Sequence, residues 1–95
     1  MGQVIWSPSA LNDIDAIAEY IARDSVDRAA LFVSRIIEST DQLQKFPLSG
    51  RVIPEMGDKS CRELLYGFYR IMYRVEDNDV WITGVVHGER DWKPA

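Results

Sequence analysis

The sequence predicts an α+β domain in which a helical hairpin packs on a small antiparallel sheet, with the element order β-α-α-β-β-β. Two observations support this fold class. Apolar residues recur at helical spacing through the first half of the chain, and they alternate with polar residues after Ser60. In addition, 95 residues with 46% apolar and 27% charged side chains suit one globular core and leave no room for a second. We therefore expect residues 1–95 to form a single domain.

A short β-favouring run and an amphipathic helix account for the start of the chain. Residues 3–6 form the run, and the pair Ser7-Pro8 is typical of a helix start, with Ser7 as the N-cap and proline at the first helical position. Apolar residues then recur every three or four positions, with acidic residues on the other side. We expect this helix to end near Arg23.

A second helix follows almost at once. Asp24 or Ser25 can cap it, and its apolar residues keep the helical spacing as far as Phe46. Pro47 then stops it, because proline lacks the N–H that a helix interior needs. So short a connection between the helices predicts that they pack side by side as a hairpin.

The second half of the chain reads as a loop followed by strands. Proline, glycine and polar residues mark residues 47–60 as the loop, with one extended piece at residues 51–53. The alternating runs after it predict three strands: residues 62–66, 69–75 and 80–87. Gly67 and the polar residues 76–79 supply tight turns, so these strands should form an antiparallel meander.

Alternation in the central strand divides its side chains between the two faces of the sheet. One set is expected to face the helices: Tyr69, Ile71, Tyr73 and Val75. The other set, with the residue before the strand, should form a semi-polar, solvated face: Phe68, Arg70, Met72 and Arg74. A face that combines arginine with apolar side chains suits an acidic and apolar peptide better than plain solvent.

Charge and cysteine content exclude several classes of protein. The net charge is -4 at pH 7, so we expect no nonspecific nucleic-acid binding, which depends on basic clusters. Cys61 is the only cysteine, so we expect no disulfide and a reducing compartment. No cluster of Cys and His residues is present to hold a structural zinc ion, so we expect no metal site. There is no signal peptide and no run of roughly 20 apolar residues, so we expect a cytoplasmic protein without a membrane span. Nothing indicates a cofactor.

Arginines dominate the candidates for binding. Five of them follow the helices: Arg51, Arg62, Arg70, Arg74 and Arg90. Arginine can hold a phosphate or a carboxylate through two parallel hydrogen bonds, so these residues could bind an anionic partner. The alternative is that they pair with the glutamates of the same region: Glu55, Glu63, Glu76 and Glu89.

Two further candidates have a structural alternative each. His87 ends the last strand, where an imidazole could act as a general base or proton shuttle. Because no nucleophile or second ligand accompanies it, a structural role is favoured. Trp92 either clamps the tail onto the domain or anchors a partner. Cys61 and the serines lack the partners that nucleophilic catalysis needs.

Several segments carry a family resemblance. They are residues 6–10, 17–22, 43–51, 62–64, 69–75 and 86–91. Three patterns among them are informative in combination: the Pro-x-x-Gly-Arg loop, the Tyr-Arg-Ile strand and the terminal His-Gly-x-Arg-Asp. Nearly the whole chain resembles, in order, the RelE/ParE superfamily of toxins from toxin-antitoxin systems. The family's fold, a helical hairpin on an antiparallel sheet, agrees with the fold predicted from periodicity.

The superfamily divides in function. RelE-like members are ribosome-dependent mRNA endonucleases, whose chemistry needs a base for the 2'-hydroxyl, an acid for the leaving oxygen and cations on the phosphate. Arg62, Arg70 and His87 fall at matching positions, but the tail lacks the terminal tyrosine, the loop lacks a lysine cluster and the net charge is negative. The ParE-like branch is the better match, and it implies a non-enzymatic inhibitor of DNA gyrase. A RelE-like RNase and a non-toxic binding protein of the same fold stay open as alternatives.

The resemblance also implies a partner, an antitoxin with a DNA-binding N-terminal part and a disordered C-terminal part. We expect an acidic, amphipathic segment of this antitoxin to fold onto exposed positions of the helical hairpin and onto one set of sheet residues. That set is Arg62, Phe68, Arg70, Met72 and Arg74. The candidates for contact with the target are Arg51, His87, Arg90 and Trp92.

Overall fold

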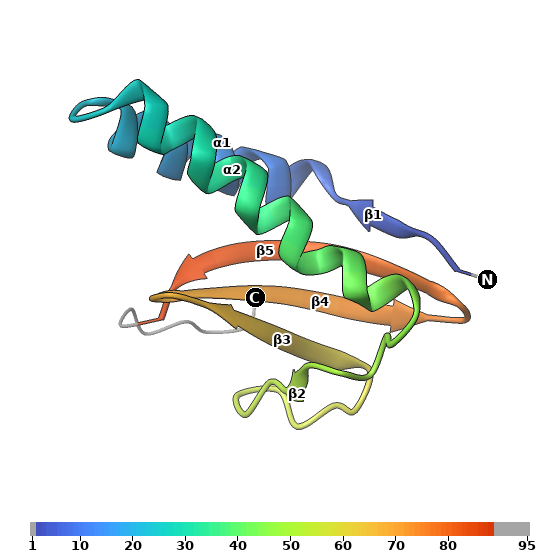
Figure 1. Ribbon diagram of the computed structural model, residues 1–95. Coiled ribbons are helices and arrows are strands. Elements are labelled where there is room, and N and C mark those ends of the chain that lie inside the picture. The colour runs from blue at the N-terminus through green and yellow to red at the C-terminus, as the bar shows by residue number, and fades with distance from the viewer. Residues whose placement is uncertain (1, 89–95) are drawn as a thin grey trace.

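Two helices lie on one side of a five-stranded sheet in the computed structural model, which describes residues 2–88 (Figure 1). In chain order the elements are β1 (Val4–Trp6), α1 (Pro8–Ala22), α2 (Val26–Thr40), a 3-10 helix η1 (Asp41–Gln44), β2 (Arg51–Val52), β3 (Cys61–Tyr66), β4 (Tyr69–Glu76) and β5 (Asp79–His87). The predicted element order is confirmed. The extended piece expected in the loop forms the short strand β2, which makes the sheet five-stranded. In the described part of the chain, neither helix is long and apolar enough to cross a membrane.

Serine side chains begin both helices, as the sequence predicts for α1 and as one of its two options for α2. The Ser7 hydroxyl accepts a hydrogen bond from the Ala10 N–H at 3.1 Å, and the Ser25 hydroxyl accepts one from the Arg28 N–H at 3.1 Å. Each bond satisfies an amide that has no partner within its own helix. The α1 helix ends at Ala22, close to the predicted end at Arg23.

The α2 helix ends earlier than predicted, at Thr40 instead of Phe46. The Ser39 and Thr40 hydroxyls donate to the carbonyls of Ile36 and Ile37, at 2.6 and 2.8 Å. Such local side-chain bonds compete with the helical ladder. The chain then tightens into η1, which places Leu43 in the core with no exposed surface.

The strands lie in the order β1-β5-β4-β3-β2. The β3, β4 and β5 strands form the predicted antiparallel meander, with bounds within one residue of those expected. The β1 strand pairs in parallel with β5, so the sheet is mixed and not wholly antiparallel. Alternation in the sequence carries no information on strand direction, and the partner of β1 lies at the other end of the chain.

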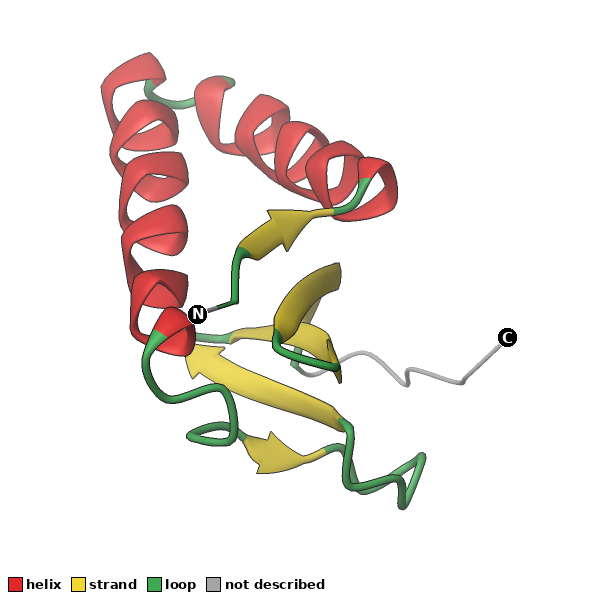
Figure 2. Ribbon diagram, turned by 90° about the vertical axis from the view of Figure 1, so that its right-hand side faces the viewer, coloured by secondary structure: helices red, strands yellow, loops and turns green. Residues whose placement is uncertain are grey.

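The main core fills the space between the helices and the sheet, the two layers drawn in red and yellow in Figure 2. Its fully buried side chains come from both layers, and include Ile14, Ile36, Leu43, Tyr73 and Ile82. The side chains that β4 was predicted to turn toward the helices all belong to this core or pack against it: Tyr69, Ile71, Tyr73 and Val75. This prediction is therefore confirmed.

The opposite face of the sheet differs from the prediction. Met72 and Arg70 were expected on a solvated face, but they are only 4% and 7% exposed. A second apolar cluster forms there from Ile53, Cys61 and Met72, with Val86 packed against it. The physical reason is the loop between β2 and β3, which lies on the side of the sheet away from the helices (Figure 1).

Candidate functional site

The loop after η1 is fixed to the sheet by a single phenol. The Tyr73 hydroxyl donates to the Pro47 carbonyl at 2.8 Å and accepts from the Gly50 N–H at 2.9 Å. Tyr73 is 1% exposed, and burial raises the pKa of its phenol, which keeps the hydroxyl available as a donor. One side chain of β4 thus holds both ends of the Pro-x-x-Gly segment.

Glycine is required at position 50 because the loop passes so close to the sheet. A Cβ atom there would lie 2.6 Å from both the Glu63 carbonyl oxygen and the Tyr73 hydroxyl. Arg62 adds to the attachment by donating to three backbone carbonyls, those of Leu48 at 3.3 Å, Gly50 at 2.9 Å and Lys59 at 2.9 Å. The Pro-x-x-Gly-Arg segment that carries the family resemblance is therefore a rigidly attached loop.

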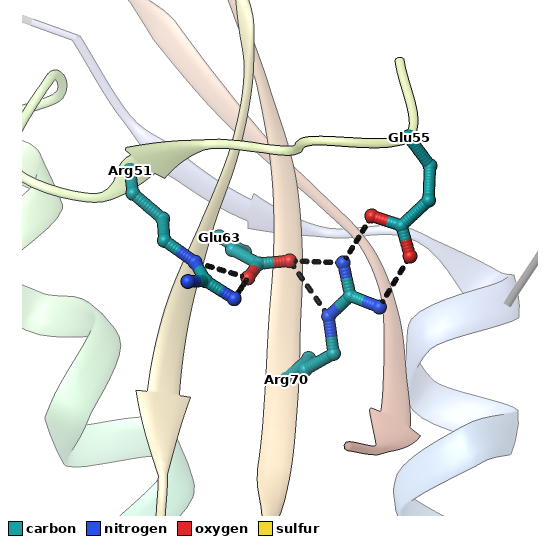
Figure 3. Close-up of polar contacts among 4 residues, drawn as sticks. All are labelled: Arg51, Glu55, Glu63 and Arg70. Atoms are coloured by element: carbon teal, nitrogen blue, oxygen red, sulfur yellow. Dashed lines mark hydrogen bonds and ion pairs between the residues drawn. The ribbon is translucent and has the colours of Figure 1, made fainter. Parts of the chain in front are cut away.

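An ion-pair network lies across the far face of the sheet beside this loop (Figure 3). Glu63 of β3 accepts from Arg51 of β2 at 2.6 Å and from the Arg70 Nε of β4 at 2.7 Å. The Nη1 and Nη2 atoms of Arg70 hold the carboxylate of Glu55 in the loop, at 2.7 and 2.8 Å, and Nη2 also lies 2.6 Å from Oε1 of Glu63. Positive and negative charges therefore alternate in the order Arg51, Glu63, Arg70, Glu55.

The interior of this network is buried and its ends are exposed. The side chains of Glu63 and Arg70 are 0% and 9% exposed, whereas those of Arg51 and Glu55 are 56% and 33% exposed. The hydrogen bond from Arg70 lowers the pKa of Glu55 to about 2, and the same pair raises the pKa of Arg70. Within residues 2–88, every buried side-chain nitrogen and oxygen has a hydrogen-bond partner.

The other sheet candidates lie outside the network. Arg74 pairs with Glu76 at 3.4 Å, and both side chains are at least half exposed. Phe68 is 72% exposed in the turn between β3 and β4, and its ring stacks on His87 with centroids 6.2 Å apart. The edge of the Tyr69 ring meets His87 at 5.4 Å.

The structure separates the residues that were grouped as candidates. Of the expected antitoxin contacts, Phe68 and Arg74 are exposed, Arg62 is bound to backbone carbonyls, and Arg70 and Met72 are buried beneath the loop. The alternative of pairing with local glutamates is confirmed for Arg51, Arg70 and Arg74. Of the expected target contacts, Arg51 lies on the edge strand β2 and His87 ends β5, and the strands β3 and β4 lie between them. Arg90, Trp92 and the proposed partner Glu89 lie outside the described residues.

One structural residue was missed by the sequence analysis. Asp13 of α1 is one of the acidic residues expected on the polar side of this helix, but its carboxylate accepts a hydrogen bond from the Val85 N–H of β5 at 2.9 Å. The ladder between β4 and β5 shifts register next to this point, between Met72 and Tyr73. The one signal in the sequence is position, because Asp13 borders the apolar stripe of its helix. In the part of the chain that the structure describes, no group of three or more His, Cys, Asp and Glu side chains could hold a metal ion.

Comparison with known proteins identifies the family. Residues 4–92 match the family described as ParE toxin of type II toxin-antitoxin system, parDE. The toxin-family protein Y4kP of Sinorhizobium fredii is 38% identical over 92 residues, which cover 95% of this chain and 92% of that protein. Toxin RelE2 of Caulobacter vibrioides is 34% identical over 91 residues, covering 95% and 99%.

A solved structure supports the fold. A chain of the chromosomal ParDE TA system from P. aeruginosa superposes with a TM-score of 0.78 at 24% identity, covering 94% of this chain and 98% of that chain. The order of helices and strands, the match along most of the sequence and the two toxin relatives agree with one another. The chain belongs to the ParE toxin family of type II toxin-antitoxin systems.

Proposed function

We propose that this toxin acts by binding DNA gyrase and is not an RNase. The observation that carries the proposal is the burial of Arg70, whose side chain is 9% exposed and whose guanidinium is bound by the carboxylates of Glu55 and Glu63. An arginine that stabilises the transition state of RNA cleavage must face the phosphate. Two carboxylates beside it would repel that phosphate, so Arg70 is suited to structure and not to phosphate binding.

The other two RNase candidates are also engaged in structure. The Arg62 guanidinium donates hydrogen bonds to backbone carbonyls of the loop, and these bonds fix the Pro-x-x-Gly-Arg segment to the sheet. The His87 ring packs between Phe68 and Tyr69, so it contributes to the end of the sheet. Three side chains at family-matching positions thus have structural partners, which favours inhibition by binding.

We also propose that an antitoxin neutralises this toxin, and that it docks on the helical hairpin. Leu11, Val26 and Ile37 are 47%, 71% and 41% exposed, a large apolar area for two surface helices. Leu11 and Ile37 are equally many residues from Asp24, in the turn of the hairpin. They therefore lie at about the same height along the axes of the two paired helices. We call these three residues the outer strip. An amphipathic helix is the partner that such a surface suits.

The charge of the hairpin changes the expected chemistry of that partner. The helices carry exposed acids at Asp15, Glu19, Asp27 and Glu38. The acidic segment expected from the sequence needs Arg70, which the loop already covers. An amphipathic segment with lysine or arginine beside its apolar face is a better complement to the helices.

A binding measurement tests the docking surface. Ile37→Asp should weaken binding of the purified cognate antitoxin by about tenfold or more, since it places a charge in an apolar contact. Leu31→Asp is the matched control, because Leu31 is 48% exposed on α2 outside the outer strip. Equal affinities of the two variants would place the antitoxin elsewhere.

The target is tested with purified components. The chain is added to gyrase and relaxed plasmid, and in parallel to a translation reaction whose message ends are mapped. We expect loss of supercoiling, reversed when the chain is first mixed with its antitoxin, and an intact message. Ribosome-dependent message cleavage with normal supercoiling would establish the RNase alternative. If neither reaction is affected and induction leaves growth normal, the chain is a binding protein with the toxin fold.

A further inference from the structure

We propose that residues 53–58 form a latch that opens as a unit from an otherwise folded domain, and that the ion pair between Glu55 and Arg70 holds it closed. The segment follows β2 and continues across the far face of the sheet toward Glu55 (Figure 3). It leaves and re-enters the sheet within a few residues. The latch therefore has a hinge at each end, and its middle is attached to the sheet through Glu55.

Few contacts attach this segment to the sheet. Within residues 2–88, the hydrogen bonds and ion pairs that join residues 54–57 to the sheet are those of Glu55 with Arg70. The other bonds of this stretch are internal, from the Met56 and Gly57 N–H groups to the Ile53 carbonyl, both at 3.1 Å. These internal bonds keep the stretch in one shape, so it moves as a unit.

The two hinges are fixed independently of Glu55. On one side, β2 pairs with β3 through Arg51 and Val52. On the other side, the Asp58 carboxylate accepts from the Ser60 N–H and hydroxyl, and the Ser60 carbonyl accepts from Val75 at 2.8 Å. Among the contacts of the described residues, opening disrupts the Glu55 pair and the contacts of Ile53, including the hydrogen bond from its N–H to the Cys61 carbonyl at 3.0 Å. Segments with few contacts open at low free energy.

The buried charges tolerate this opening. Arg70 has a second carboxylate partner, Glu63, which Arg51 also holds. When Glu55 leaves, Arg70 and Glu63 remain paired, and no isolated charge stays behind in the sheet. The penalty of an unpaired buried ion is thereby avoided.

Opening uncovers a surface that the closed latch hides. Ile53 packs against Cys61 and Met72, which are 3% and 4% exposed. With the latch open, Met72 and Cys61 become accessible together. The latch thus decides whether the Arg70 and Met72 side of the sheet can meet a partner at all.

Cys61 supplies a direct readout, because it is the only cysteine of the chain. The rate at which the uncharged reagent iodoacetamide alkylates Cys61 in the full-length protein measures how often the latch opens. Glu55→Gln removes the charge of the pair and should raise this rate about tenfold, as the loss of one strong hydrogen bond implies. Glu38→Gln makes the same charge change on α2 and should leave the rate unchanged. Each rate is divided by that of the same variant in denaturant, to remove differences in thiol reactivity.

Urea dependence in the parent protein gives a second measurement that needs no variant. A latch that opens locally exposes little surface, so the alkylation rate should be nearly independent of urea at low concentration. If the rate instead rises with the slope of global unfolding, Cys61 is reached only when the whole domain unfolds, and the latch does not exist. Equal rates for the parent and Glu55→Gln would show that the ion pair does not hold the segment closed.

Discussion

Replacing Tyr73 with phenylalanine removes one oxygen atom and should destabilise the whole loop attachment. The change leaves the Gly50 N–H and the Pro47 carbonyl without their shared partner, in a region where Gly50 and Tyr73 are buried. Each buried polar group that loses its hydrogen bond costs about 1–3 kcal/mol, reduced where the loop can admit water. We expect Tyr73→Phe to lower the free energy of unfolding by about 2–3 kcal/mol.

Urea denaturation followed by tryptophan fluorescence measures this loss. With a slope of about 1–3 kcal/mol per molar urea for a small domain, the midpoint should fall by roughly 1–2 M. Tyr20→Phe is the matched control, since Tyr20 is 69% exposed on α1, and it should change the stability by less than about 0.5 kcal/mol. If Tyr73→Phe is as stable as this control, the phenol does not hold the loop and Arg62 alone attaches it.

Three further predictions follow from other contacts. Gly50→Ala should lower the free energy of unfolding by about 2 kcal/mol or more, because its Cβ would meet the Glu63 carbonyl and the Tyr73 hydroxyl at 2.6 Å; an unchanged thermal midpoint would show that the loop can shift. The Glu55 carboxyl has a pKa of about 2 in the folded chain against an ordinary value of 4.5, so its stabilising effect is present above pH 4.5 and is lost as the pH falls toward 2. The stability of Glu55→Gln, measured by denaturation across this range, should depend less on pH, and identical profiles would contradict the pairing. Asp13→Ala should lower the free energy of unfolding by about 1–2 kcal/mol, because the Val85 N–H loses its hydrogen bond. Asp15→Ala removes no such bond and should leave the melting temperature within a few degrees of that of the parent.

The layers of the fold were predictable because local patterns determine them. Helical spacing and two serine caps located α1 and the start of α2, and the change to alternation located the meander. The end of α2 was not predictable from apolar spacing, since Leu43 continues the pattern while the backbone changes to a 3-10 helix. The parallel pairing of β1 was equally hidden, because it depends on contact with the far end of the chain.

The sequence named the four residues of the ion-pair network as possible pairing partners, but it did not predict that Arg70 and Glu63 are buried. Alternation assigned Arg70 and Met72 to the face away from the helices, which is correct, and then treated that face as solvated. The loop covers it, and loop placement is a long-range effect that no period reveals. A signal did exist in Ile53, Cys61 and Met72, apolar residues that the helices cannot cover. Together with the local glutamates, they point to a second covered face.

We propose that Arg70 and Glu63 serve the structure and take no direct part in toxicity. The double variant Glu63→Met/Arg70→Met tests it most directly, because apolar side chains of similar length often replace a buried ion pair with little loss of stability. The exposed ends of the network, Arg51 and Glu55, can then be solvated by water. The measurement is growth arrest after induction, in a strain that the parent toxin arrests and with folding verified by the thermal midpoint. We expect the double variant to arrest growth as strongly as the parent. A folded variant that still binds the antitoxin but no longer arrests growth would show that these charges act on the target.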